Sequence, residues 1–181
     1  ARRDHQEHTG AAPRKPLHAT MLAYITTDAQ ISVAHLRRAL REATDRSFNA
    51  VTVDDHASTN DTVVALASGA SNMRIESLRG VSRFARALTE VCESLAYQIA
   101  ADGEGATKVI TVRVSGARSE ADANGIARAI ANSPLVKCAM HGNDPNWGRI
   151  VSAAGYCGAP FDPVRATLKL QGTTVFRAGR P

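Results

Sequence analysis

Thr20 is the first residue whose type and position suggest chemistry. It follows the small residue Ala19, and the apolar run 21–27 begins directly after it. A threonine hydroxyl is a poor nucleophile until a base removes its proton, and the α-amino group of the same residue can act as that base. Such a base exists only if the chain is cut between Ala19 and Thr20. An ordinary β-forming threonine at the start of a strand explains the same residues, so the pattern leaves both interpretations open.

Glu104 is the second candidate, because it lies between Gly103 and Gly105. Flanking glycines permit unusual backbone angles and a close approach by a ligand. A carboxylate presented in this way is suited to bind the cationic amine of a substrate. A solvated loop carboxylate is the alternative interpretation.

A metal site is not indicated by the acidic and histidine residues. Asp54, Asp55 and His56 are consecutive and Asp61 follows nearby, but neighbouring residues of an extended segment point in opposite directions. The pattern therefore favours a solvated loop. The sequence has no glycine-rich phosphate-binding motif, so we expect no nucleotide cofactor, and we expect no metal cofactor either. It also has no GxSxG motif, so a serine-hydrolase nucleophile is not indicated.

The elements that must position these residues follow from hydrophobic periodicity and turn residues. Strands are predicted at 21–27, 48–53, 108–115 and 135–140, and a hairpin at 164–170 and 173–176 around Gln171-Gly172. Helices are predicted at 33–44 with Ser32 as the cap, 62–68, 82–102 and 120–131, whereas 149–154 is compatible with a helix or a strand. Alternating strands and helices without repeats predict an α/β, or α+β layered, fold. We expect a flexible lead-in or a remnant of a preceding chain at 1–19 and one domain at 20–181.

Composition narrows the class of protein further. The 181 residues carry a net charge of +5, yet the arginines are scattered and aromatic residues make up 4%. A basic nucleic-acid-binding module is thus a weak alternative. Neither a long apolar segment nor a secretory signal is visible, and the three cysteines, Cys92, Cys138 and Cys157, show no metal or disulfide spacing. We expect a cytoplasmic protein with reduced cysteines and no membrane partner.

Five motifs in one order then point to a family. They are ATMLAYITTDA (19–29), STNDTV (58–63), DGEGATK (102–108), ARAIANSPLVK (127–137) and GNDPNWGRI (142–150). Together they closely resemble the β-chain region of the ornithine acetyltransferase family, the bifunctional glutamate N-acetyltransferases of arginine biosynthesis. The family's α/β fold is similar to the layered N-terminal-nucleophile hydrolases.

The resemblance implies a mechanism and its residues. A precursor of this family cleaves itself at an Ala-Thr bond, which matches Ala19-Thr20 here. The exposed Thr20 is then the catalytic nucleophile: it takes the acetyl group from N-acetylornithine and passes it to glutamate through an acetyl-threonine intermediate. Glu104 matches a substrate-binding residue. Asn60 and Asn143 are candidates for polar site contacts, with structural roles in turns as the alternative.

The resemblance also implies the partners. An α chain of the same precursor is expected, in an α2β2 heterotetramer, with residues 20–181 as a β-chain-like domain that lacks its C-terminal segment. No metal or redox cofactor is implied, and acetyl-CoA is an alternative acetyl donor. A catalytically incomplete or degenerate fragment of the family, inactive alone, is the main alternative.

Overall fold

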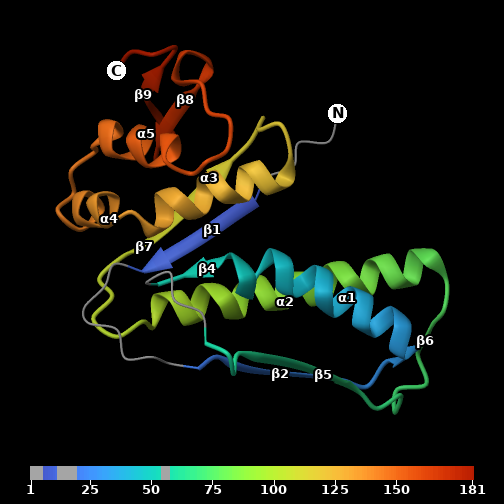
Figure 1. Cartoon of the computed structure of the whole chain (residues 1–181). Coiled ribbons are helices and arrows are strands. Elements are labelled where there is room, and N and C mark those ends of the chain that lie inside the picture. Colours follow the sequence, from blue (N-terminus) through green and yellow to red (C-terminus); the bar gives the residue numbers. More distant parts are fainter. Residues whose placement is uncertain (1–5, 12–19, 54–57) are drawn as a thin grey trace. The chain divides into compact units, whose positions relative to one another are not determined.

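The computed structural model describes residues 6–11, 20–53 and 58–181 (Figure 1). Contacts within the chain divide these residues into two compact units. Residues 20–51 and 58–99 form what we call the Thr20 unit, and residues 6–11, 52–53 and 100–181 form the Glu104 unit. The division into a lead-in and one domain at residue 20 stays a prediction. Residues 6–11 fall within that expected lead-in, and in the structure they form a strand.

The Thr20 unit is a layer of two helices on a pair of parallel strands. Strand β2 (Leu22–Thr27) pairs with β5 (Thr62–Ala67), with Leu22 opposite Thr62. The short strands β3 (Gln30–Ile31) and β6 (Arg74–Ile75) pair in the same way. Figure 1 shows helices α1 (Val33–Arg46) and α2 (Leu78–Ala101) on one side of β2 and β5. After α1, Phe48–Ala50 forms a 3-10 turn.

Small side chains make this packing close. The buried core of the Thr20 unit consists of Ala23, Ala39, Ala43, Phe48, Leu88, Cys92 and Ala96. Four of these seven are alanines, and a methyl group lets neighbouring backbones approach more closely than larger apolar side chains would. Ser32 caps α1 as the sequence predicts, because its side chain accepts a hydrogen bond from the His35 amide at 3.2 Å.

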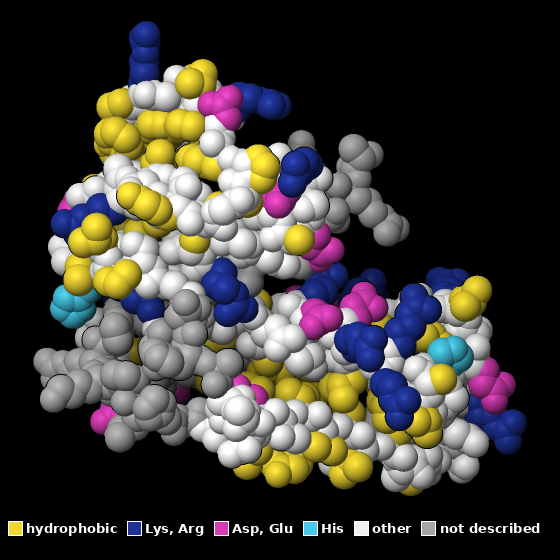
Figure 2. Space-filling model, in the orientation of Figure 1, with side chains coloured by type: hydrophobic (Ala, Val, Ile, Leu, Met, Phe, Trp, Pro, Cys, Tyr) yellow, Lys and Arg dark blue, Asp and Glu magenta, His cyan; other side chains and the backbone are white. Residues whose placement is uncertain are grey.

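The other face of β2 and β5 is apolar and exposed. Leu22 is 57% exposed, Tyr24 69% and Leu66 58%. Figure 2 shows hydrophobic side chains gathered over these strands. Parallel strands in proteins usually have both faces covered, because the connections between them cross over the sheet and place helices on its faces.

The Glu104 unit contains a three-stranded sheet in the order β4-β1-β7. Its strands are β4 (Val51–Thr52), of which Thr52 belongs to this unit, β1 (Gln6–Ala11) and β7 (Val109–Val114). Strand β1 runs antiparallel to β7. Helix α3 (Glu120–Asn132) lies against β1 and β7 (Figure 1). Further along the chain come α4 (Pro134–His141), α5 (Trp147–Gly155), the 3-10 turn Pro163–Arg165, and the hairpin β8 (Thr167–Leu170) and β9 (Thr173–Arg177).

The helices of this unit close a second core. Ile126, Ile130, Val136, Ile150, Ala153 and Ala154 are buried together. The Trp147 and Phe176 rings stack with their centroids 5.2 Å apart, which joins α5 to the hairpin. The predicted turn of that hairpin is confirmed: Gln171 and Gly172 both have positive φ, 48° and 86°, as the tight turn between antiparallel strands requires.

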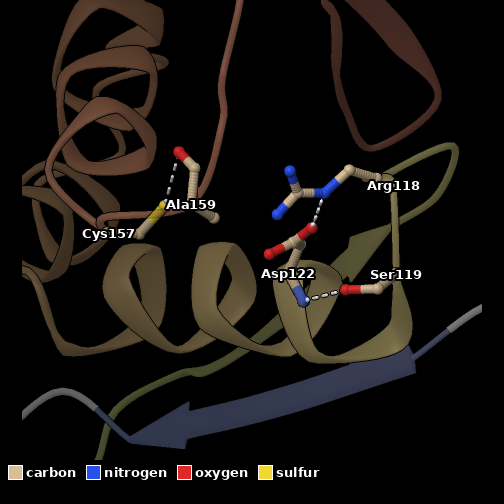
Figure 3. Close-up of polar contacts among 5 residues, drawn as sticks. All are labelled: Arg118, Ser119, Asp122, Cys157 and Ala159. Atoms are coloured by element: carbon tan, nitrogen blue, oxygen red, sulfur yellow. Dashed lines mark hydrogen bonds and ion pairs between the residues drawn. The ribbon is translucent and has the colours of Figure 1, made fainter.

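Local hydrogen bonds determine where α3 begins and how the chain leaves α5 (Figure 3). The Ser119 hydroxyl accepts from the Asp122 amide at 3.1 Å, and Arg118 Nε lies 3.1 Å from Asp122 Oδ2. The carboxylate of Asp122 is thus held in the first turn, where it opposes the positive end of the helix dipole. The Cys157 thiol lies 3.9 Å from the Ala159 carbonyl oxygen after α5.

Three predicted elements differ from the structure. Of the predicted helix 62–68, residues Thr62–Ala67 form strand β5 instead, because their β-branched residues pair with β2. Residues 135–140 lie in helix α4 rather than a strand: Ser133 caps it and Pro134 occupies its first turn. Of the predicted strand 48–53, the first half is a 3-10 turn and Val51–Thr52 alone is extended. No helix in the described ranges has the length and apolar character needed to cross a membrane.

Candidate active site

Thr20 lies exposed, two residues before β2 begins. Its Oγ1 is 3.0 Å from the Oγ of Ser58, in a hydrogen bond that either hydroxyl can donate. Ala19, the other residue of the predicted cleavage site, lies outside the described residues. The described part of the site therefore consists of the threonine hydroxyl and the groups that hold it.

The turn before β5 holds the segment that carries Thr20. The Met21 amide donates to Asp61 Oδ1 at 2.8 Å, and the Thr62 amide donates to the Met21 carbonyl oxygen at 2.9 Å. These bonds continue the β2–β5 pairing by one residue toward Thr20. The backbone next to the nucleophile candidate is thereby tied to the start of β5.

Asn60, a predicted site contact, contributes through its backbone. Its amide donates to the Ser58 hydroxyl at 3.2 Å, and its carbonyl oxygen accepts from the Thr62 hydroxyl at 3.0 Å. Asn60 thus shapes the turn, while its neighbours Ser58 and Asp61 reach residues 20 and 21. Sequence reasoning missed these two residues, although both belong to the STNDT motif. Their only signal was membership of that motif.

Glu104 lies at the tip of a tight turn in the Glu104 unit. The Ala106 amide donates to the Gly103 carbonyl oxygen at 2.8 Å, and Gly105 has a φ of 71°, in the region that favours glycine. The Glu104 side chain is exposed. Among the described residues no cation forms an ion pair with its carboxylate.

Lys108 anchors the chain that follows this turn. Its ammonium group donates to the carbonyl oxygens of Met140 and His141 at 2.6 and 2.9 Å, and to Asn143 Oδ1 at 2.5 Å. The Thr107 hydroxyl lies 3.2 Å from His141 Nδ1. A cation at the C-terminus of a helix satisfies carbonyl groups that have no partner within the helix.

Asn143, the other predicted polar contact, therefore has a structural role here. Its side-chain oxygen is engaged by Lys108, and its φ of 56° places it in the left-handed region that asparagine tolerates. Asn143 terminates α4 and holds Lys108. Of the two roles that the sequence left open for Asn143, a polar site contact and a structural role in a turn, these contacts favour the structural role.

The candidate residues fall into two groups. Thr20 and Asn60 belong to the Thr20 unit, whereas Glu104 and Asn143 belong to the Glu104 unit. Asp54, Asp55 and His56 lie outside the described residues. Within the described ranges, no cluster of three or more His, Cys, Asp or Glu side chains is arranged to hold a metal ion.

The three cysteines are free thiols in different environments. Cys92 is buried in the core of the Thr20 unit, Cys138 is exposed and Cys157 is half-buried. Burial raises the pKa of the Cys92 thiol above its ordinary value, and the charge of Glu93 acts in the same direction, whereas a hydrogen bond with Ser47 lowers it. A buried thiol that resists ionisation is a core residue rather than a nucleophile.

A comparison with solved structures identifies the class of fold. The crystal structure of the arginine biosynthesis bifunctional protein argJ from Bacillus halodurans matches with a TM-score of 0.86 and 42% sequence identity. The match covers 90% of this chain and 77% of that chain. The predicted layered α/β fold is therefore confirmed.

The family follows from the sequence comparisons. The model of the ArgJ family matches residues 8–181, and the chain belongs to this family. The arginine biosynthesis bifunctional protein ArgJ of Symbiobacterium thermophilum is 53% identical over 174 residues, and that of Desulfotalea psychrophila is 48% identical over 172 residues. A chloroplastic relative from Citrullus lanatus is 46% identical over 177 residues. The family predicted from the motifs is confirmed.

The chain spans less than half the length of these curated relatives. The alignments cover 94–95% of this chain but 43%, 44% and 38% of the three relatives. The relatives are named as bifunctional proteins of arginine biosynthesis. Their names assign them to amino-acid biosynthesis, and what the whole protein does comes to this chain as a proposal.

Proposed function

We propose that the full-length protein transfers an acetyl group from N-acetylornithine to glutamate through an acetyl ester on Thr20, after cleavage at Ala19-Thr20. The observation that supports this best is the exposed Thr20 hydroxyl, bonded to Ser58 at 3.0 Å at the start of β2. The chain belongs to the ArgJ family, whose resemblance implied that this hydroxyl carries an acetyl group, and this membership supports the proposal. Acetyl-CoA is a possible second donor, and no metal takes part in the proposed steps.

The proposed transfer begins with attack by the Thr20 hydroxyl. Thr20 Oγ1 attacks the acetyl carbonyl, the amide bond of N-acetylornithine breaks, and the hydroxyl proton ends on the departing amine. The α-amino group of Thr20, freed by cleavage, carries this proton between the two atoms. The neutral amine of glutamate then attacks the ester carbonyl, the bond between the acetyl carbon and Oγ1 breaks, and the proton lost by that amine passes to Oγ1 as N-acetylglutamate leaves. The acetyl-threonine intermediate thus replaces one direct transfer between the two substrates with two transfers that each have a lower barrier.

Glu104 is proposed to bind the cationic amine of the ornithine part. Its support is the exposed carboxylate on a glycine-flanked turn, with Lys108 anchoring the chain just beyond. A charge-assisted contact of this kind selects a basic substrate over a neutral one. Substitution of Glu104 is thus expected to raise KM for N-acetylornithine more than it lowers kcat.

We also propose that an α chain of the same precursor covers the exposed face of β2 and β5, in an α2β2 assembly. The apolar residues Leu22, Tyr24 and Leu66 on that face support this, because parallel strands are usually covered on both sides. The relatives are also more than twice as long as the matched region. L66D in the full-length protein should weaken association of the two chains, whereas R38D on the exposed side of α1 should not.

A catalytically incomplete chain is the second candidate. It is favoured by the coverage of 43% of the Symbiobacterium relative. On that view residues 20–181 fold but do not transfer acetyl groups without the rest of the protein. Comparing this chain with the full-length protein distinguishes the two.

Mass spectrometry of the full-length protein tests the proposal. The wild type should yield a chain beginning Thr20-Met21-Leu22, and N-acetylornithine should add one acetyl group to it. T20A should abolish cleavage and acetylation, while T20S should keep a measurable part of both. A single uncleaved mass, with no acetyl adduct after exposure to N-acetylornithine, would contradict the proposal.

A further inference from the structure

The contact between Thr20 and Ser58 points to a second reacting hydroxyl in the site. We propose that Ser58 is a catalytic residue that holds Thr20 Oγ1 and donates a hydrogen bond to it when Oγ1 is an acyl oxygen or a leaving group. This inference rests on the function proposed for Thr20. Its basis is the 3.0 Å contact between the two hydroxyl oxygens.

The position of Ser58 is determined by its own turn. The Asn60 amide donates to Ser58 Oγ at 3.2 Å, and the Ser58 side chain is half-buried while Thr20 is exposed. Three residues further on, Asp61 binds the Met21 amide at 2.8 Å. The same turn therefore holds both the hydroxyl of residue 20 and the backbone of residue 21. Two such anchors restrict the positions that Oγ1 can take relative to β2.

The number of protons on the two hydroxyl groups decides which of them donates the hydrogen bond between Ser58 and Thr20. A serine hydroxyl has one proton and two lone pairs, and one lone pair of Ser58 accepts from Asn60. In the free enzyme either hydroxyl can donate to the other. Once Thr20 carries an acetyl group, Oγ1 has no proton, so a bond can persist only with Ser58 as the donor. Ser58 then also faces the negative charge that develops on Oγ1 when the amine of glutamate displaces it.

A positioned donor of this kind accelerates the step in which the charge appears. Removing one donor to a developing oxyanion costs about 10²-fold in rate in other acyl-transfer enzymes. Ser58 does not need to touch the bulk of the substrate in this role. We therefore expect its loss to reduce kcat by about 10²-fold with little change in KM for either substrate.

The test compares S58A, S58T and T59A in the full-length protein. S58T keeps a hydroxyl, and Thr59 is an exposed neighbour in the same turn, so T59A is the matched control. Steady-state kinetics give kcat and KM, and rapid quenching followed by mass spectrometry gives the decay of acetyl-Thr20 on addition of glutamate. The decay should be about 10²-fold slower in S58A, intermediate in S58T because the hydroxyl is kept, and equal to that of the wild type in T59A.

The outcomes separate this inference from the proposed function. Absence of transfer by the wild type would overturn both. Transfer by the wild type with S58A decaying as fast as T59A would overturn the role of Ser58 alone. A folded S58A that remains uncleaved, beside cleaved S58T and T59A, supports the role, because the same Oγ1 attacks in cleavage. If thermal unfolding shows that S58A is misfolded, a folded S58T whose kcat is as low as that of T20A would overturn the role.

Discussion

Lys108 Nζ donates a hydrogen bond to Asn143 Oδ1 across 2.5 Å, and the same ammonium group reaches the last carbonyl groups of α4. This contact joins the start of β7 to the end of α4, between residues that are 35 positions apart. The turn that carries Glu104 lies directly before β7. We call the hydrogen bonds of Lys108 with Met140, His141 and Asn143 the Lys108 clamp. This clamp limits how far the turn that carries Glu104 can move relative to α4.

Replacing Lys108 should destabilise the fold. K108M keeps the apolar stem but removes the ammonium group, which leaves two helix carbonyl groups and Asn143 without this donor. We expect a loss of about 1–3 kcal/mol in the free energy of unfolding, measured by urea denaturation. K169M on strand β8, where the side chain is exposed, is the control and should change it by less than about 0.5 kcal/mol. Equal effects of the two variants would exclude the clamp.

Asn143 allows its backbone and its side chain to be tested separately. With φ at 56°, alanine at this position is strained, whereas glycine is not. Both substitutions remove the acceptor for Lys108. N143A should therefore be less stable than N143G by about 1 kcal/mol, and both should be less stable than the wild type. An N143A protein as stable as N143G would mean that the backbone here does not need the left-handed conformation.

Asp61 should control the protection of the segment that follows Thr20. Its Oδ1 accepts from the Met21 amide at 2.8 Å, and asparagine keeps an oxygen at that position whereas alanine does not. Hydrogen exchange of the Met21 amide should be about tenfold faster in D61A than in D61N. E76A, at an exposed residue of the same unit, is the control and should exchange as the wild type does. Equal exchange in D61A and D61N would show that the carboxylate does not hold this amide.

Cys92 should make the chain less stable in alkaline solution. Its pKa is raised above the ordinary value of 9.0 by burial, so the unfolded state loses the proton first as the pH rises. The contribution of this pKa shift to the free energy of unfolding is complete below pH 9.0, and it declines as the pH rises above that value. Urea denaturation at pH 8 and pH 10 should show a steeper loss for the wild type than for C92A, by at most about 1.4 kcal/mol per pH unit.

The control for this pH dependence is C138A. Cys138 is exposed, so the wild-type difference between the two pH values should persist in this variant. C92A itself is expected to be less stable at both values, because it leaves a small cavity in the core. A wild-type slope identical to that of C92A would show that the buried thiol does not contribute.

Local signals were enough to predict several elements. The β-forming residues after Thr20 predicted β2, Ser32 predicted the start of α1, and Gln171-Gly172 predicted the hairpin turn. Each depends on neighbours within a few residues along the chain. The motifs also identified the family, which the comparisons confirm.

Nonlocal contacts decided what the sequence alone left open or misassigned. Residues 62–67 became a strand because β2, about 40 residues earlier, offers a parallel partner. Within 135–140, the apolar residues suit a strand or a helix, and the Ser133-Pro134 start together with burial of Val136 favours the helix.

The candidate site divides in the same way. The sequence by itself made Thr20 and Glu104 candidates, because a threonine that follows Ala19 and a carboxylate between two glycines are recognised from the residues and their immediate neighbours. The tertiary structure decided that Ser58 and Asp61 hold residues 20 and 21, across separations of 38 and 40 positions. Such partners follow from the pairing of β2 with β5, which brings distant backbone together and which no short-range pattern encodes.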